Sequence, residues 1–118
     1  YFPTHFPLTD SATMREEAEP QPICIFSTVV GAMVVATADG TVLAVNTDAD
    51  FEQNVWINHG NGYVTIYRNS GEVKVKQGET VTRGTTLFII DDKDSELGYQ
   101  MLKDGIYINP MDVLAING

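Results

Sequence analysis

The sequence predicts an all-β domain, built as a compact antiparallel sandwich or barrel. Three observations support this: runs rich in β-branched residues, alternation of apolar and polar residues, and turn signals about every 8 to 12 residues. Roughly nine short strands fit after residue 22. Chains with many short strands and regularly spaced turns fold as sandwiches or barrels.

The first 22 residues are expected to form an irregular N-terminal segment (1–22), followed by a β domain over residues 23–118. Prolines interrupt the segment repeatedly, and the acidic patch REEAE lies within it. A short helical turn fits here, capped by Asp10 or Ser11 and ended by Pro20. The strands are therefore predicted to begin at Ile23.

Apolar runs rich in β-branched residues predict strands at 23–30, 32–38 and 41–47. Asp39-Gly40 separates the last two runs. This dipeptide is a strong hairpin signal, because a type I′ turn needs a positive φ at both central residues. We expect the runs 32–38 and 41–47 to pair with each other as a hairpin.

Two more hairpins are predicted further along the chain. Gly60-Asn61-Gly62 follows the strand run NVWINH, and Asp104-Gly105 follows LGYQMLK. Between these hairpins, valines alternate with lysines over residues 73–76, which predicts one dry and one wet face. A turn at Pro110 and about one helical turn are expected to close the domain.

The charge balance excludes a common class of partner. The chain has 7 Lys and Arg residues against 16 Asp and Glu residues, for a net charge of −9. A groove that follows a phosphate backbone needs a cationic surface. No nucleic-acid partner is therefore expected.

The single cysteine, Cys24, excludes an intramolecular disulfide and a multi-cysteine metal site. It lies in the apolar run ICIFSTVV, so we expect a buried side chain that acts as a small hydrophobe rather than a nucleophile. No run approaches the roughly 20 apolar residues of a membrane helix. The opening YFPTHFPLTD is typical of the inside of a longer protein, so an anchoring or export segment is expected outside this chain.

Four stretches, in order, carry a resemblance to a known family: GAMVVATADGTVLAV, VWINHGNGYVTIYRN, VKVKQGETVTRGTTLFII and LGYQMLKDGIYINPMDVL. Together they resemble the LytM, or M23, family of peptidoglycan endopeptidases over residues 30–114. The resemblance implies a duplicated hybrid motif with a groove across one sheet. It also implies a bacterial, extracytoplasmic protein of the cell surface or cell wall.

The chemistry implied by the resemblance needs one zinc ion. Active members hold it with a His and an Asp four residues apart and with the second His of a His-x-His motif. Two further histidines assist proton transfer. Such a site keeps an open coordination position, where bound water becomes acidic enough to act as the nucleophile.

This chain departs from that pattern at each of those positions. Asn69 stands where the family has a histidine after Tyr67 and Arg68, and Glu96-Leu97-Gly98 stands in place of His-x-His. Counting back from Gly31 puts Gln21 and Ile25 at the first His and Asp. We therefore predict no catalytic residue, no metal ligand and no cofactor. The candidate vestigial groove consists of Tyr67, Asn69, Glu96, Gly98 and Tyr99, with the two tyrosines proposed to contact ligand.

The two histidines do not rescue the site. His59 matches a family position that is not a zinc ligand, and a role in stabilising the turn or at the surface is expected. His5 is followed by Asp10 five residues later instead of four. A zinc peptidase that uses His5, Asp10 and Glu96 as atypical ligands stays open as an alternative.

The leading functional prediction is a non-catalytic LytM-like domain of a cell-wall-associated protein, membrane-anchored through a region outside this chain. Its expected partner is peptidoglycan or a cell-envelope protein, in hydrolase regulation or in cell-envelope or sporulation assembly. A lipoyl or biotinyl carrier domain is the further alternative, with Lys93 as the modified residue. Carrier domains place that lysine before the glycine-punctuated segment, whereas Lys93 follows it here.

Overall fold

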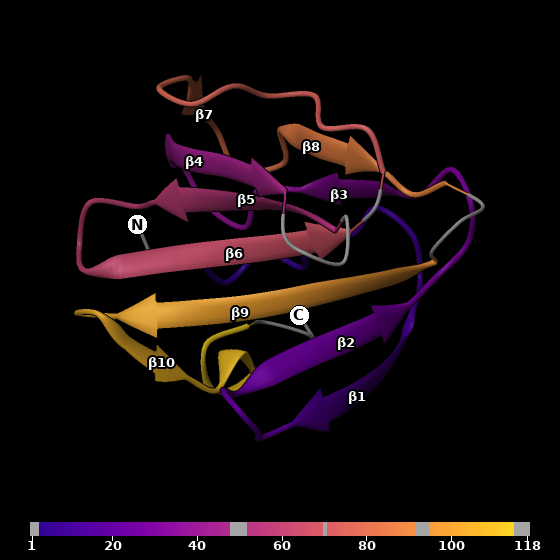
Figure 1. Ribbon diagram of the computed structural model, residues 1–118, viewed down its shortest axis with the longest axis horizontal. Helices are drawn as coiled ribbons and strands as arrows, with labels where there is room; N and C mark the ends of the chain where they lie inside the picture. The colour runs from indigo at the N-terminus through magenta and orange to yellow at the C-terminus, as the bar shows by residue number, and fades with distance from the viewer. Residues whose placement is uncertain (1–2, 48–51, 70, 92–94, 115–118) are drawn as a thin grey trace.

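The structure is a computed structural model, which describes residues 3–47, 52–69, 71–91 and 95–114. Within these ranges the chain forms ten strands and one short 3-10 helix, η1 (Figure 1). None of the described helical structure is long and apolar enough to cross a membrane.

The strands follow one another at short intervals along the chain. Their bounds are β1 Thr13–Glu17, β2 Ile23–Ser27, β3 Met33–Val35, β4 Gly40–Thr47, β5 Gln53–Asn58, β6 Tyr63–Asn69, β7 Thr80–Val81, β8 Thr86–Ile89, β9 Glu96–Lys103 and β10 Ile106–Ile108. The helix η1 covers Pro110–Asp112, where the Asn109 side chain caps it by accepting from the Met111 N–H. The predicted Pro110 turn is thus confirmed.

Two antiparallel sheets make up the domain. The large sheet has eight strands in the order β1-β2-β9-β6-β5-β4-β7, with β10 paired to β9. The small sheet pairs β3 with β8 and lies beside β4 and β5 in Figure 1. The predicted all-β, antiparallel architecture is confirmed.

The core lies between the two sheets. Side chains of a strand alternate between its faces, so every second residue of a strand points into this core. Phe26, Tyr67 and Tyr99 come from the inner face of the large sheet, and Val34 and Phe88 from the small one. All five are at most 1% exposed. The opposite face of the large sheet carries Ile25, Arg68 and Gly98, which lie in one row by strand register. The residues of the predicted groove are therefore divided between the two faces, with Gly98 on the outer face and Tyr67 and Tyr99 on the inner one.

Two of the three predicted hairpins are confirmed. β5 pairs with β6 across Gly60-Asn61-Gly62, and β9 pairs with β10 across Asp104-Gly105. Asp104 and Gly105 have φ angles of 52° and 82°, as a type I′ turn requires. The local turn chemistry was therefore a sufficient signal at both places.

The hairpin predicted at Asp39-Gly40 is wrong. β3 pairs with β8, while β4 pairs with β5 and β7, so the dipeptide connects the two sheets instead of joining paired strands. Neither residue has a positive φ. The Asp39 carboxylate instead accepts from the Arg83 N–H at 2.8 Å, which ties this corner to the turn after β7.

The irregular N-terminal segment predicted for residues 1–22 is wrong at residues 13–17, which form β1, and no described residue there is helical. β1 pairs with β2 along its whole length, from Thr13 opposite Ser27 to Glu17 opposite Ile23. All five of its residues are exposed, so its sequence lacks the alternating apolar pattern by which a strand is recognised. The predicted domain boundary at residue 23 itself stays a prediction.

Candidate functional site

Four of the positions that the resemblance aligns with catalytic or metal-binding residues of the family come together on the large sheet. Glu96 and Gly98 lie on β9, and Gly98 is flanked by Arg68 of β6 on one side and Ile25 of β2 on the other. Asn69 ends β6, and its Nδ2 donates to the Glu96 carbonyl at 2.7 Å. We call Ile25, Asn69, Glu96 and Gly98 the vestigial site.

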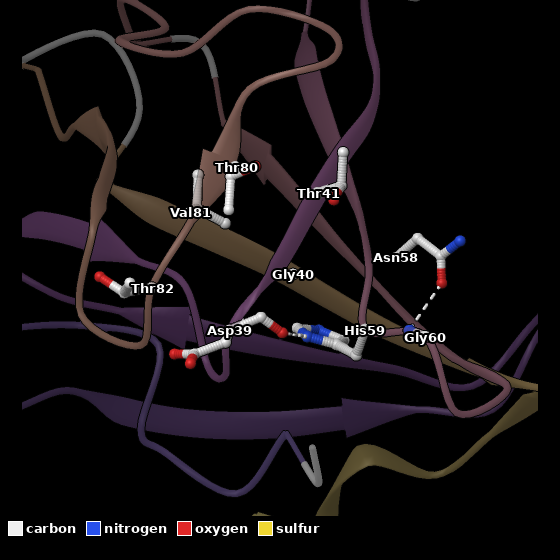
Figure 2. Close-up of a pocket in the computed structure, with 9 residues that line it drawn as sticks. All are labelled: Asp39, Gly40, Thr41, Asn58, His59, Gly60, Thr80, Val81 and Thr82. Atoms are coloured by element: carbon white, nitrogen blue, oxygen red, sulfur yellow. Dashed lines mark hydrogen bonds between the residues drawn. The ribbon is translucent and has the colours of Figure 1, made fainter.

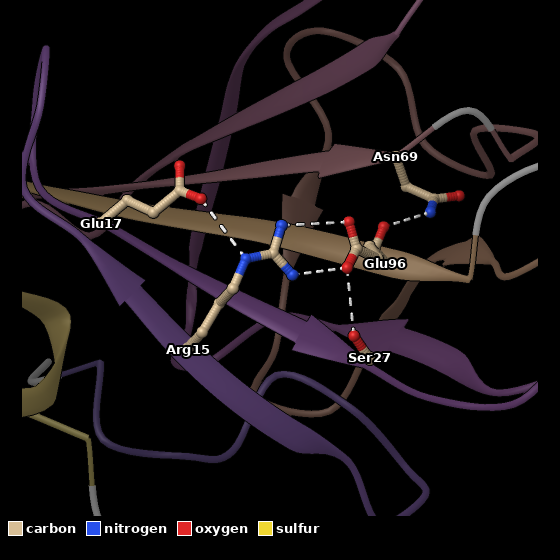
Figure 3. Close-up of polar contacts among 5 residues, drawn as sticks. All are labelled: Arg15, Glu17, Ser27, Asn69 and Glu96. Carbon is tan, nitrogen blue, oxygen red and sulfur yellow. Dashed lines mark hydrogen bonds and ion pairs between the residues drawn. The ribbon is translucent and has the colours of Figure 1, made fainter.

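An ion pair crosses the vestigial site. Arg15 lies on β1, level with Ile25 and Gly98, and its guanidinium reaches over β2 to Glu96 (Figure 3). Nη1 and Nη2 donate to the two carboxylate oxygens of Glu96 at 2.6 and 3.3 Å. The Ser27 hydroxyl adds a hydrogen bond of 3.1 Å to the same carboxylate. The paired guanidinium lowers the pKa of Glu96, so this carboxylate stays ionised and engaged.

The residues of the vestigial site do not fit the zinc ion that the family implies. Gly98 has no side-chain donor, Ile25 is a hydrocarbon, and Glu96 is held by the guanidinium of Arg15. A Cβ added at Gly98 would lie 3.2 Å from Ile23 Cδ1 and 3.4 Å from Arg68 Cβ, so neighbours already crowd that space. The positive charge of Arg15 beside Glu96 also repels a metal ion. Gln21 is exposed in the turn before β2.

The alternative ligand set of His5, Asp10 and Glu96 is not brought together. Nowhere in the described part of the chain do three His, Cys, Asp or Glu side chains lie close enough to hold a metal ion. His5 instead hydrogen-bonds the Phe6 carbonyl through Nδ1 at 2.6 Å. Lys93, the candidate carrier lysine, lies outside the described residues.

Asn69, the residue in place of the family's histidine, is fully buried. Its Nδ2 donates to the Glu96 carbonyl, and its Oδ1 accepts from the Gly71 N–H at 2.7 Å. Both ends of the amide therefore hydrogen-bond backbone groups. The side chain ties β6 to β9 instead of facing a groove.

Tyr67 and Tyr99 were expected to contact ligand, and this expectation is wrong. Both side chains are 0% exposed and lie on the inner face, with ring centroids 5.3 Å apart. The Tyr67 hydroxyl accepts from the Thr37 N–H at 3.1 Å and hydrogen-bonds the Thr65 hydroxyl at 2.7 Å. The Thr37 hydroxyl bridges the two phenols at 3.1 and 3.0 Å. Burial raises the pKa of both tyrosines, so they stay neutral.

His59 extends this buried network and is not a surface residue. Its ring links the β3-β4 connection to β6, and its predicted role in stabilising the turn stays a prediction. It is 4% exposed, Nδ1 hydrogen-bonds the Asp39 carbonyl at 2.8 Å, and Nε2 lies 2.9 Å from the Thr65 hydroxyl. The imidazole borders a surface hollow of about 380 Å³ between β4, β7 and the β5-β6 turn (Figure 2). Since both ring nitrogens are engaged within the protein, His59 has no free nitrogen to offer a metal or ligand in the hollow.

Stability should fall as the pH drops below the ordinary pKa of histidine, and His59 should cause it. Burial lowers the pKa of His59 below 6.5. The unfolded chain then takes up a proton before the folded chain does, so the free energy of unfolding decreases by up to about 1.4 kcal/mol per pH unit between the two pKa values. Urea unfolding from pH 7 to 5 measures this slope. His59→Gln should remove it and His5→Gln should keep it; an unchanged slope in His59→Gln would contradict the assignment.

The prediction that Cys24 is buried is confirmed, and Tyr63 takes part in a further side-chain contact. Cys24 is 0% exposed, as predicted, and burial raises the pKa of its thiol to about 11, which makes it unreactive. Tyr63 is half-buried with the Lys103 ammonium 4.6 Å from its ring centroid, a cation–π contact. Sequence reasoning missed Arg15 and Ser27, because the contacts of both with Glu96 depend on β2 pairing with β1 on one side and β9 on the other.

The comparisons with known proteins agree with this geometry. The family model of Peptidase family M23 matches residues 24–110. Stage II sporulation protein Q of Bacillus subtilis is 26% identical over 87 residues, which cover 69% of this chain and 31% of that protein. An uncharacterized metalloprotease of Haemophilus influenzae is 32% identical over 93 residues, covering 75% of this chain and 20% of that protein. The chain thus spans about a third or less of the length of these curated relatives.

Solved structures share the fold. Csd3 of Helicobacter pylori superposes with a TM-score of 0.79 at 18% identity, covering 96% of this chain and 33% of that one. The catalytic domain of the prophage-encoded M23 protein EnpA from Enterococcus faecalis gives 0.74 at 18% identity, covering 99% and 98%. The SpoIIQ-SpoIIIAH pore-forming complex gives 0.70 at 19% identity, covering 96% and 91%.

The sequence resemblance to the LytM or M23 family is therefore confirmed by a family match over most of the domain and by the shared fold. The matched range includes Ile25, Asn69, Glu96 and Gly98. This chain belongs to peptidase family M23.

Proposed function

We propose that this domain is a non-catalytic member of family M23 that acts at the cell envelope by binding a protein partner. The observation that carries the proposal is the ion pair of Arg15 with Glu96, which lies level with Ile25 and next to Gly98. Where the family needs imidazole and carboxylate ligands around an open coordination position, this chain offers a glycine, an isoleucine and a fixed cation. The same fold is kept, so selection for binding explains it better than selection for hydrolysis.

Similarity to stage II sporulation protein Q supports a protein partner. A solved structure of that protein is a complex with SpoIIIAH, described as pore-forming. The net charge of −9 also suits contact with a basic protein surface and is unsuited to an acidic one. An extracytoplasmic location and an anchor outside this chain belong to the same proposal. Peptidoglycan is the second candidate ligand, because the matching family is a peptidase family.

The purified protein should retain less than about a tenth of an equivalent of zinc. The reason is that a stable zinc site needs three or more donor side chains, and the vestigial site presents one carboxylate that is already paired with Arg15. Elemental analysis after incubation with zinc and dialysis without chelator measures this content. An active zinc peptidase of the family, taken through the same dialysis, serves as the control.

Retention of one equivalent, together with release of soluble fragments from peptidoglycan, would contradict the proposal. The similarity to the Haemophilus influenzae metalloprotease would then become the better guide to function. Sedimentation with insoluble peptidoglycan separates the two candidate ligands. Loss of the protein from the supernatant in the absence of zinc would favour peptidoglycan over a protein partner.

A further inference from the structure

Strand β1 is an open edge of the large sheet. It pairs with β2 on one side only, and no described strand pairs with its other side (Figure 1). Its 5 residues make it longer than β7 with 2 or β10 with 3. About half of the peptide groups of an edge strand point away from the sheet, where they can hydrogen-bond an added strand.

Two surface hollows flank this edge. One, of about 280 Å³, is lined by Phe6, Ser11, Ala12, Met14 and Phe26. Its walls are mainly apolar, with the Phe6 and Phe26 rings 5.2 Å apart edge to face. The other, of about 320 Å³, lies at the far end of β1, and Glu16, Glu17 and Asn109 contribute its polar groups.

The register of β1 puts Met14 and Glu16, one residue from each hollow, on one face of the strand. Met14 stands opposite Phe26 and Glu16 opposite Cys24, so both residues point toward the side of the sheet that holds the core. Residues two apart on a strand share a face. A strand added along β1 would therefore place side chains two positions apart over the apolar hollow and over Glu16.

Charge selects a basic side chain for the second position. Glu16 accepts from the neutral amide of Asn109 at 2.9 Å, which leaves its negative charge in place. Glu17 pairs with Arg15 at 3.3 Å, but the same guanidinium is shared with Glu96. The edge is therefore acidic overall. A second copy of this chain carries a net charge of −9 and is a poor match.

We propose that β1 binds an extended segment of a protein partner as an added strand. An apolar side chain of that segment fills the hollow of Phe6, Met14 and Phe26, and a lysine or arginine two positions away pairs with Glu16. This inference rests on the proposed function, since it assigns the surface and the chemistry of that protein partner. It makes the sheet edge, and not the vestigial site, the recognition surface.

The probe for this site is a short threonine peptide in which one valine and one lysine stand two positions apart, added to protein labelled with ¹⁵N. Amide signals of residues 13–17 should shift, and their hydrogen exchange should slow, because an added strand hydrogen-bonds the open edge. Two control peptides separate the contributions. A valine-glutamate peptide tests charge, and a valine-lysine peptide with methylated backbone nitrogens tests strand addition.

Matched variants test the acidic end. Glu16→Lys combined with Glu17→Lys should weaken binding of the valine-lysine peptide about tenfold, since two favourable charge contacts become repulsive. Glu72→Lys combined with Glu79→Lys changes the net charge equally at two exposed glutamates outside β1, and it should leave the affinity within about twofold. Met14→Lys should weaken binding as well, by placing a charge in the apolar hollow.

Several results would contradict strand addition at β1. Equal weakening by both pairs of glutamate substitutions would show that the peptide responds only to net charge. Binding of the N-methylated peptide would show that no strand is added to the sheet. Either result would overturn the inference. Shifts at another surface, self-association through residues 13–17, or no binding would also overturn it. None of these results bears on the zinc content, so the non-catalytic proposal would survive them. Stoichiometric zinc with peptidoglycan cleavage would defeat that proposal whatever the peptide does.

Discussion

Replacing Tyr67 by alanine is expected to lower the free energy of unfolding by about 3–5 kcal/mol, the range for large aromatic side chains in a core. Tyr67 is 0% exposed and packs between the two sheets. The change leaves a cavity and also strips the Thr37 N–H of its acceptor. Chemical unfolding followed by tryptophan fluorescence measures the loss, since the chain has one tryptophan.

Phenylalanine variants separate packing from hydrogen bonding. Tyr67→Phe should cost about 1–3 kcal/mol, because it leaves a buried N–H unsatisfied. Tyr99→Phe should cost less, about 0.5–1.5 kcal/mol, since the Tyr99 phenol hydrogen-bonds the Thr37 hydroxyl, and that hydroxyl still has Tyr67. Equal costs for the two variants would contradict the described network. Loss of partner or peptidoglycan binding with unchanged stability would instead support contact of these tyrosines with a ligand.

The network explains why the sequence suggested a ligand surface where the structure has a core. A strand with tyrosine at alternate positions fits both a sugar-stacking face and an inner face whose hydroxyls find partners. The difference depends on Thr37, which lies 30 residues before Tyr67 and 62 before Tyr99. No local pattern encodes such a contact. Because Thr37, Thr65 and His59 are polar, the sequence did not predict that they lie together in the interior.

The fold itself was largely predictable, because its turns and strands are local features. Gly60-Asn61-Gly62 and Asp104-Gly105 make the hairpins that their chemistry predicts. Asp39-Gly40 has the same chemistry but serves another purpose. Gly40 lies where a Cβ would come 2.6 Å from the Asn58 carbonyl oxygen, so this glycine permits a close strand approach instead of a turn.

The vestigial site was predictable in what it lacks and not in what replaces it. The motif positions alone exposed Asn69 and Gly98 as departures from the family's histidines. The ion pair joins Arg15 to Glu96, 81 residues apart, through a strand whose residues are all exposed. Exposed strands carry no hydrophobic periodicity, so β1 was assigned to an irregular segment. The salt bridge of Arg15 with Glu96 became visible only once that strand was placed.

Asn69→Asp is expected to lower the free energy of unfolding by about 3–5 kcal/mol at pH 7, because it puts an uncompensated charge in the interior. The Asn69 amide donates to the Glu96 carbonyl, and a carboxylate there would present an acceptor to an acceptor. The contact of its Oδ1 with the Gly71 N–H can survive the change. The defect is therefore specific to the lost donor and the new charge.

The pH dependence distinguishes this explanation from a general loss of packing. A buried carboxyl group has a raised pKa, so lowering the pH toward 4.5 protonates it and lets it donate to Glu96 again. The stability deficit relative to the unmodified protein should then shrink. Asn54→Asp is the matched control, because the Asn54 side chain already acts as acceptor for the Trp56 indole and lies opposite Arg68. A deficit in Asn69→Asp that stays constant with pH would mean that Asn69 only fills space, and that the family's histidine position has no part in joining β6 to β9.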